Sequence, residues 1–281
     1  LMDRLGHPYI GQKVLQIAGT SGKGPVSLIA YEILKRMFLS VALYTSPHLT
    51  LVMERIKRGD LFISPENFVK YLNLVKKATD DMYENDIYGP PSYHETIFST
   101  ALLYFKDEIP DLTIIETGLG WKNDYTKILP SSLVSVITNI SFDHMDYLGN
   151  TLESIASNKA DIISENSMCI TGCNEPSLLA IIKEKAMRKN SQLMVIERDF
   201  EVNLREENIF DYKSRYGEYR ELKLPLTGKH QMINASIAIK AAEEVLQLKG
   251  LNLNENTLRC ALKEVRIPGR LEVISQNPTI I

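Results

Sequence analysis

The chain has 281 residues, of which 44% are hydrophobic, and a formal net charge of −3. Its length and apolar content allow a sizeable core, in one large domain or two smaller ones. The slightly negative charge excludes a broad basic face, so we expect no nucleic-acid partner, and a bound polyanion needs a local site. No apolar run reaches the roughly 20 residues that span a bilayer, and the chain opens without a basic, apolar leader. We therefore expect a cytoplasmic protein without a membrane partner, or a mitochondrial one in a eukaryote.

Cysteine usage also favours a reducing compartment. The chain has three cysteines, too few for a disulfide framework. The spacing of Cys169 and Cys173 would allow both to bind one metal ion, but the residues that flank them in sequence are typical of a strand end. We predict that both are buried free thiols.

A glycine-rich turn follows the first apolar run, which ends at Ile17. Residues 18–26 read Ala-Gly-Thr-Ser-Gly-Lys-Gly-Pro-Val. Such a turn between a strand and a helix gathers backbone N–H groups at a helix N-terminus, where they bind phosphate. Gly19 and Gly22 let the backbone curl, and Lys23 supplies a cation for the outer phosphates. Because Ile17 rather than glycine stands six positions before Lys23, the turn is a shorter variant of the standard P-loop, and an ordinary strand–turn–helix junction stays an alternative.

Apolar β-type runs alternate with helical stretches along most of the chain. This alternation indicates an α/β fold with a mostly parallel sheet and helices on both faces. The expected strands span residues 13–18, 41–45, 112–116, 133–138, 167–171 and 192–196. The expected helices span residues 25–38, 65–80, 95–106, 151–163, 176–188, 230–248 and 254–264.

Three stretches interrupt the alternation. Residues 83–92 are polar and rich in helix breakers, which predicts a loop. Residues 200–225 are charged and aromatic, and they predict a small β-hairpin insertion. After Arg270 we expect one strand with nothing to pair with, as if another domain began there.

Three polar residues stand at or just after the ends of expected strands, namely Ser46, Glu116 and His144. Ligands of open α/β sheets lie beyond the carboxyl ends of the strands, which here also carry the phosphate turn. A carboxylate at that edge suits a nucleotide-bound Mg²⁺, which takes few protein ligands. Taken singly, Ser46 could cap a helix, Glu116 could be a solvated strand end and His144 a surface histidine. We predict instead that the three side chains converge on one divalent ion.

Several segments form a series that runs over nearly the whole chain. They are residues 19–25, 44–49, 54–56, 116–120, 143–151, 155–160, 228–235 and 268–270. This series resembles the motifs of the folylpolyglutamate synthase and dihydrofolate synthase group of the Mur ligase superfamily. The segment Tyr-Thr-Ser-Pro-His favours the folate branch over the peptidoglycan ligases.

The resemblance implies a Mur-ligase-like ATP-binding domain over residues 1–270. Residues 271–281 would begin a C-terminal glutamate-ligase domain that is missing here, and a segment before Leu1 would be missing as well. The implied activity is ATP-dependent: a carboxylate of dihydropteroate or of a folate polyglutamate tail is phosphorylated, and the amine of L-glutamate attacks the acyl phosphate. The implied cofactors are ATP and Mg²⁺, and a second divalent or monovalent cation stays open. The partners are these small molecules, and we expect a monomer.

The resemblance also implies roles for individual residues. The residues that would contact ATP are Gly19, Thr20, Ser21, Gly22, Lys23, Gly24, Asn234 and Arg270. Those that would hold magnesium are Ser46, Glu116 and His144. Those that would serve in catalysis are Lys23, His144 and Lys159. Those that would contact the pterin are Asn123, Asp124 and Tyr125. Lys159 matches a family lysine that is often carbamylated, although an exposed helix lysine at Lys159 and a helix-face residue at Asn234 are simpler alternatives.

Some positions depart from the family pattern. Pro25 replaces a serine or threonine and removes a hydroxyl and a backbone N–H from the turn, so we expect the fold to survive and phosphate binding to weaken. Trp121 puts a large ring where the family chain passes close to the ligand, and Lys127 replaces an amide. Two other functions therefore stay open. One is a non-catalytic relative that binds nucleotide, and the other is a Mur-type ligase that acts on an amino-acid or peptide carboxylate.

Overall fold

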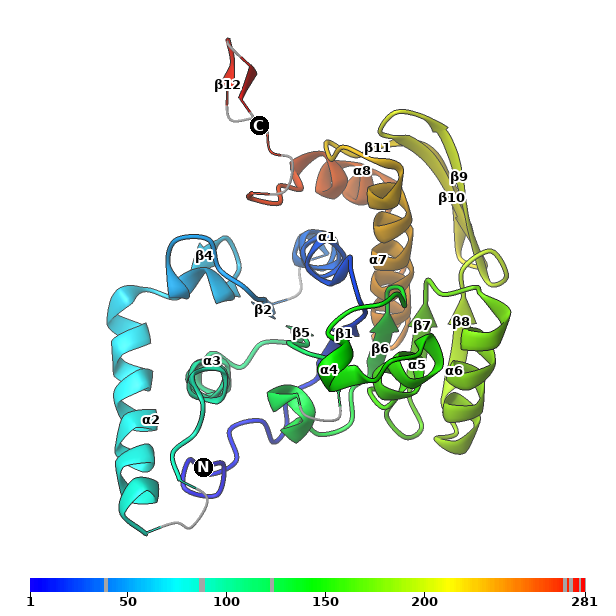
Figure 1. Ribbon diagram of the computed structural model, residues 1–281. Helices are drawn as coiled ribbons and strands as arrows, with labels where there is room; N and C mark the ends of the chain where they lie inside the picture. The colour runs from blue at the N-terminus through cyan, green and yellow to red at the C-terminus, as the bar shows by residue number, and fades with distance from the viewer. Residues whose placement is uncertain are drawn as a thin grey trace.

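The computed structural model describes residues 1–37, 40–85, 89–121, 124–269, 272, 275–277 and 279–280. Its centre is an eight-stranded sheet with the order β4-β3-β2-β5-β1-β6-β7-β8 (Figure 1). These strands are β1 Val14–Ala18, β2 Val41–Tyr44, β3 Ile56–Arg58, β4 Leu61–Phe62, β5 Leu112–Glu116, β6 Val134–Ile137, β7 Met168–Thr171 and β8 Gln192–Val195. The six strands from β2 to β8 in this order run parallel, as predicted, and β3 and β4 add an antiparallel edge.

Helices cover both faces of the sheet, which confirms the predicted fold class. They are α1 Lys23–Arg36, α2 Pro65–Asn85, α3 Tyr93–Glu108, α4 Met145–Leu148, α5 Leu152–Ala160, α6 Pro176–Arg188, α7 Lys229–Gln247 and α8 Glu255–Glu264, with short 3₁₀ helices η1 Val52–Arg55 and η2 Tyr125–Ile128. Leu15 and Ile17 of β1 belong to the core under α1, α7 and α8. Val14 and Ala18 of the same strand belong to two cores on the opposite face, formed with α2 and α3 and with α5 and α6. The central strands are apolar throughout because both of their faces are buried.

The insertion after β8 is larger than predicted. It forms a three-stranded antiparallel sheet, β9 Phe200–Glu206, β10 Ile209–Ser214 and β11 Gly217–Lys223, rather than a hairpin. Two tight turns make the extra strand possible, and Asn208 takes a positive φ of 64° in the first of them. The apolar side of this small sheet packs against α7, so Phe200, Phe210 and Tyr212 join the core of the main sheet.

Other boundaries also differ from the predictions. Helix α2 continues to Asn85, so the predicted loop at 83–92 began too early; residues 86–88 lie outside the described part of the chain. The helix continues because glycine and proline appear only from Gly89 onward. The expected unpaired strand near the C-terminus is wrong, since β12 Ser275–Gln276 pairs with β13 Thr279–Ile280. No helix in the described ranges is long and apolar enough to cross a membrane.

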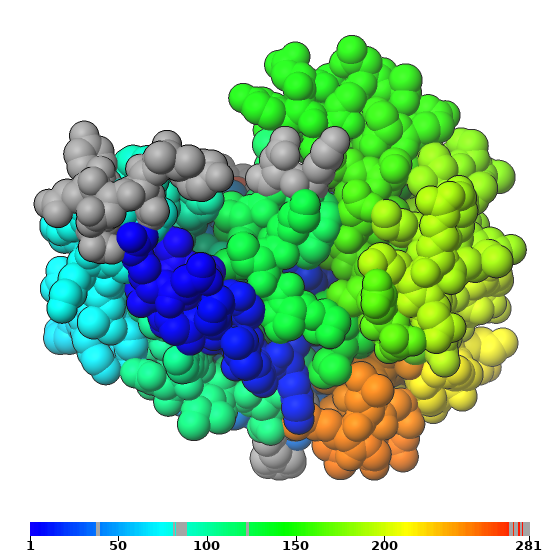
Figure 2. Space-filling view, turned by 90° about the horizontal axis from the view of Figure 1, so that it is seen from below, coloured from blue at the N-terminus to red at the C-terminus, as the bar shows by residue number. Residues whose placement is uncertain are grey.

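Parallel pairing brings four strand ends together at one edge of the sheet. Ile17 of β1 lies opposite Glu116 of β5, and Ala18 lies opposite Ile137 of β6. On the other side of β5, Tyr44 of β2 lies opposite Ile115. The segments that leave β1, β2, β5 and β6 therefore begin side by side. Figure 2 shows the N-terminal segment, in blue, lying on the surface of the molecule beside the green middle part of the chain.

Candidate functional site

The phosphate turn is folded so tightly that two of its positions admit only glycine. Gly19 has φ +149° and Gly22 has φ +84°. A Cβ on Gly19 would lie 1.8 Å from Oγ1 of Thr138, and one on Gly22 would lie 2.4 Å from Oδ1 of Asn234. The turn is thus pressed between the end of β6 and the start of α7, and Asn234, which the sequence places near nucleotide, contacts the turn itself.

The segment after β6 holds this turn in place. The backbone N–H of Thr20 donates to the carbonyl of Asn139 (3.0 Å), and its hydroxyl donates to the carbonyl of Ser141 (3.0 Å). The Asn139 side chain accepts from the N–H of Ser21 (2.8 Å) and donates to its hydroxyl (2.7 Å). These hydrogen bonds tie the turn to the segment after β6, so its backbone is already ordered before a ligand binds.

Two amines stand at the turn. Nζ of Lys23 donates to the carbonyls of Gly19 (3.0 Å) and Thr20 (3.3 Å). Lys159 of α5 is only 1% exposed, so the alternative of an exposed helix lysine is wrong. Burial, followed by the nearby charge of Lys23, lowers the pKa of Lys159 to about 8. The carboxylates of Asp143 and Asp124 act on the same amine in the opposite direction, but less strongly than burial and Lys23.

Pro25 occupies the first turn of α1, as expected. Gly22 precedes the helix, and its carbonyl accepts the first helical bond from the N–H of Val26 (3.0 Å). The N–H that proline lacks is one of those that have no partner within a helix. The substitution therefore costs the helix nothing and removes one donor from the surface that the turn offers to a ligand.

Ser46 and Glu116 are in contact, as the predicted ion site requires. The backbone N–H of Ser46 donates to Oε2 of Glu116 (3.1 Å), and Glu116 is 4% exposed, so it is not a solvated strand end. A Cβ built on Gly24 would lie 3.8 Å from both carboxylate oxygens, which places Glu116 beside the phosphate turn. Ser46 does not cap a helix; it lines a cavity that His144 also lines. The His144 ring is largely exposed, and its Nε2 lies 3.4 Å from Oδ1 of Asp143.

These residues fit a magnesium ion held mainly by its nucleotide. A buried carboxylate and a hydroxyl next to a phosphate turn are hard oxygen donors, which Mg²⁺ prefers, and phosphate and water complete its shell. Within the described ranges, no three His, Cys, Asp or Glu side chains stand close enough to bind a metal by themselves. Cys169 and Cys173 are buried free thiols, as predicted.

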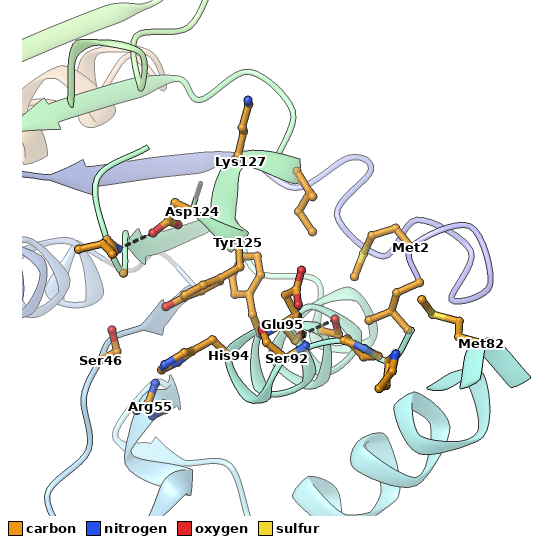
Figure 3. A pocket seen from close by; sticks show the side chains of 18 of the residues that line it. Met2, Ser46, Arg55, Met82, Ser92, His94, Glu95, Asp124, Tyr125 and Lys127 are labelled. Carbon is orange, nitrogen blue, oxygen red and sulfur yellow. Dashed lines mark hydrogen bonds between the residues drawn. The ribbon is translucent and has the colours of Figure 1, made fainter. Parts of the chain in front are cut away.

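A cavity of about 1230 Å³ opens next to Ser46. Asp124, Tyr125 and His144 line it, and its far end is lined by Met2 and Met82 (Figure 3). The Asp124 carboxylate is 6% exposed and accepts bonds from the N–H groups of Leu119 (2.6 Å) and Thr126 (2.9 Å). Asp124 therefore shapes the wall of the cavity, because its oxygens are engaged by the loop.

An aromatic surface forms another wall of the cavity. The rings of His94 and Tyr125 are parallel within 6°, with centroids 5.7 Å apart. The centroid of the Phe98 ring lies 5.3 Å from that of Tyr125. Burial raises the pKa of Tyr125, so its hydroxyl stays protonated at neutral pH. Flat, apolar surfaces of this kind stack against planar rings.

The loop between β2 and β3 is fastened by a motif whose role the sequence did not reveal. The Glu54 carboxylate accepts from the N–H groups of Leu49 (2.8 Å), Thr50 (3.0 Å) and Leu51 (2.7 Å), and these bonds lower its pKa. The next residue, Arg55, donates from Nε to Nδ1 of His48 (2.9 Å). The Glu-Arg-Ile motif therefore holds the loop that begins at Ser46.

The structure brings most of the predicted residues to one edge of the sheet. Asn123 and Arg270 lie outside the described residues. Trp121 does not line the cavity; its ring packs on the core under α5 and α6, and its backbone N–H donates to Oδ1 of Asn158 (2.8 Å). Sequence reasoning missed His94 and Arg55 as lining residues. Only the Glu-Arg-Ile match offered a signal for Arg55, and His94 had none.

Comparisons with known proteins agree with this fold and site. The Mur ligase middle domain matches residues 17–242, and the chain therefore belongs to the Mur ligase family. A dihydrofolate synthase/folylpolyglutamate synthase of Bacillus subtilis (strain 168) is 33% identical over 286 residues, which cover 100% of this chain and 66% of the relative. The chain thus spans just under two thirds of that relative's length. The resemblance to the folylpolyglutamate and dihydrofolate synthases is confirmed.

Solved structures give the same result. A folylpolyglutamate synthase (FPGS) complex with AMPPCP and folate has a TM-score of 0.93 at 30% identity, covering 100% of this chain and 69% of that chain. A folylpolyglutamate synthase of Thermotoga maritima has a TM-score of 0.87 at 32% identity, covering 97% and 62%. The predicted α/β architecture is that of these enzymes.

Proposed function

We propose that this chain is the nucleotide-binding part of an ATP-dependent ligase. The enzyme would add L-glutamate to dihydropteroate or to a (tetrahydro)folate polyglutamate tail through an acyl phosphate. One observation carries the proposal: Lys23, Lys159 and Glu116 meet at the phosphate turn, next to a cavity with an aromatic wall. Relatives described as dihydrofolate and folylpolyglutamate synthases support it.

ATP would lie with its phosphates over the turn from Gly19 to Gly24. The backbone N–H groups at the start of α1 and the amine of Lys23 attract the phosphates. AMPPCP, which one related structure contains, is an analogue of ATP and supports this assignment. Asn234 borders the turn from α7, and Arg270 is a further proposed contact.

Magnesium would be held by Ser46, Glu116 and His144. When bound, it neutralises phosphate charge and polarises the transferred phosphoryl group. Lys159 would stand close to the outer phosphates. Its pKa of about 8 makes its neutral form far more abundant near neutral pH than that of an ordinary lysine, which suits the carbamylation that we propose for it.

The acceptor would occupy the cavity, with its planar ring against His94 and Tyr125. Its carboxylate would face Ser46, where the phosphoryl group arrives. Lys23 stabilises the charge that builds up on that group, and the walls of the cavity limit the access of water to the acyl phosphate. The amine of glutamate then attacks and phosphate leaves. No protein nucleophile is required.

A second candidate is a relative that binds nucleotide without catalysis. Pro25, which removes a donor from the phosphate turn, favours it. A third candidate, a Mur-type ligase for an amino-acid or peptide carboxylate, has no observation in its favour beyond the shared fold. A monomeric state, a cytoplasmic location and an ATP-binding domain over residues 1–270 stay predictions.

Calorimetry and phosphate release test the proposal together. We expect Mg-ATP to bind, Lys23→Met to abolish binding, and Glu116→Gln to weaken it. Lys13→Met, in the segment before β1, serves as a control for the loss of one amine. Phosphate release is then compared with dihydropteroate, tetrahydrofolate and peptidoglycan precursors. Silence at millimolar Mg-ATP contradicts nucleotide binding, and release only with peptide precursors contradicts the folate assignment.

A further inference from the structure

Arg55 is a buried cation without a carboxylate partner. The residue is 4% exposed, and no ion pair joins it to a carboxylate among the described residues. Its guanidinium carbon lies 5.8 Å from the centroid of the Tyr93 ring, a contact that offsets only part of the cost of burying the charge. Nε donates to His48, but the buried Nη1 has no hydrogen-bond partner. An uncompensated buried charge is costly to a folded chain, so a guanidinium kept in this state indicates an anion that binds to it.

Two tyrosine hydroxyls near this guanidinium also lack a hydrogen bond of normal geometry. They belong to Tyr44 and Tyr125, and both are buried. Tyr44 lies within reach of Tyr125 and Arg55, and Tyr125 lies within reach of Ser46. Their rings meet edge to face, with centroids 6.3 Å apart. An ordinary phenol is protonated at neutral pH, so a hydroxyl in this place can donate to an anion.

Two of these three groups, Arg55 and Tyr125, line one end of the cavity. Ser46 lines the same end, and Tyr44 ends the strand that leads into Ser46. Figure 3 shows the Tyr125 side chain extending toward Ser46, with Arg55 and His94 beside it. Because Ser46 contacts Glu116, an anion held here lies next to the proposed phosphoryl-transfer site.

We propose that Arg55 and Tyr125, supported by the buried Tyr44, form a receptor for the carboxylate of the acceptor, a planar aromatic acid. This inference rests on the proposed function and deepens it, because it names the groups that select an ionised acceptor and position it. The guanidinium pairs with the carboxylate, and the Tyr125 hydroxyl donates to one of its oxygens. Tyr44 does not line the cavity, and it positions the other two side chains from the end of β2. The ring of the acid continues along His94 and Phe98.

The receptor should distinguish an acid from its neutral isostere. Pteroic acid and its carboxamide have the same ring system and nearly the same shape, but only the acid carries a charge. A buried charge-assisted pair is worth roughly ten-fold to a hundred-fold in affinity. We therefore expect wild-type protein to bind the acid at least about ten times more tightly than the amide.

Equilibrium binding to both ligands, followed by fluorescence quenching, tests the inference. Arg55→Met should weaken acid binding to the level of the amide and leave amide binding within about three-fold. Arg55→Lys should retain part of the preference because it keeps the charge, and Tyr125→Phe should lose part of it. Arg58→Met is the matched control, since Arg58 lies on β3, pairs with Glu108 and does not line the cavity.

The outcomes separate the inference from the proposed function. If wild-type protein binds acid and amide equally well, or Arg55→Met keeps the preference, the receptor is wrong and the ligase assignment stands. If wild-type protein binds neither ligand, the proposed function fails and the receptor fails with it. Circular dichroism confirms that each variant is folded, and if Arg55→Met is not, Arg55→Lys and Tyr125→Phe decide the question.

Discussion

Gly22 shows how a single missing side chain shapes the phosphate turn. Its φ of +84° is the conformation that glycine adopts readily, and its hydrogens face the Asn234 amide. Gly11 has the same φ of +84°, but a Cβ on Gly11 would meet nothing within 4 Å. The two glycines thus share a backbone conformation and differ in the space around them.

We expect Gly22→Ala to destabilise the protein more than Gly11→Ala. Gly11→Ala adds only left-handed backbone strain, about 1–2 kcal/mol. Gly22→Ala adds a clash with Asn234 and should cost about 1–3 kcal/mol more. Urea unfolding followed by circular dichroism measures both changes. Equal losses of unfolding free energy would show that the Asn234 side chain can move away from the added methyl group without cost.

Pro25 tests whether the turn is weakened for phosphate. Pro25→Ser restores an N–H and a hydroxyl, whereas Pro25→Ala restores the N–H alone. A donor to a charged group is worth about 1.5–3 kcal/mol, so we expect Mg-ATP affinity to rise roughly ten-fold to a hundred-fold in Pro25→Ser, with part of the gain in Pro25→Ala. Calorimetry measures the dissociation constants. Unchanged affinity in both variants would mean that this position does not face the phosphates.

At the scale of elements, a buried polar network joins the three-stranded insertion to α7. The Glu243 carboxylate accepts from the hydroxyls of Tyr212 (2.7 Å) and Ser214 (3.0 Å). Lys240 is fully buried and lies one helical turn before Glu243. Its Nζ lies 2.6 Å from Oε1 of Glu244 and stands over the ring of Tyr216. Burial raises the pKa of Glu243, so its charged form depends on the donors that surround it. The insertion therefore packs on α7 through charged and polar contacts as well as apolar contacts.

Removing one donor from this network should cost more than removing an ordinary hydrogen bond. Tyr212→Phe deprives a buried carboxylate of a partner and should lower the unfolding free energy by about 1.5–3 kcal/mol. The control is Tyr219→Phe, whose hydroxyl donates to the neutral carbonyl of Leu253 (3.2 Å), with an expected loss of about 0.5–1.5 kcal/mol. Chemical denaturation compares the two variants. Equal losses in the two variants would mean that Glu243 is neutral in the folded protein.

At the scale of the whole molecule, stability should depend on pH through Lys159. Its pKa falls from 10.5 to about 8 on folding, because burial disfavours the charged amine. Between these pH values the unfolded chain binds more protons, so this residue makes the protein more stable as pH rises. The full effect is about 3 kcal/mol, and below pH 8 the cost of burying the charge is present in full.

Other groups oppose this trend, so a variant is needed to isolate it. Burial raises the pKa of Cys169 to about 12, and the folded state therefore holds that proton longer than the unfolded chain. We expect the difference in unfolding free energy between wild type and Lys159→Met to change in favour of wild type by about 1 kcal/mol per pH unit from pH 8 to 9.5. Urea titrations at several pH values measure it. A constant difference would show that the amine is solvated or neutral throughout.

The sequence by itself determined the sheet, the order of its helices and the phosphate turn. These features follow from local patterns: apolar runs such as Val14–Ala18, helix caps, and glycines followed by a lysine. It also placed Ser46 and Glu116 at the same edge, because parallel strands must bring their carboxyl ends together. Short pieces were harder to predict, and the edge strands β3 and β4 and the third strand of the insertion were missed.

Only the tertiary structure decided which side chains share an environment. Arg55 and His94 are distant in sequence from the phosphate turn, and no local pattern indicates that they line a cavity with Tyr125. Trp121 looked like a ligand-side residue but packs into a core, because the chain turns at Gly120 and directs it toward α5. Burial and unpaired hydrogen-bonding groups are properties of the packed chain. They depend on contacts between segments that the sequence order does not reveal.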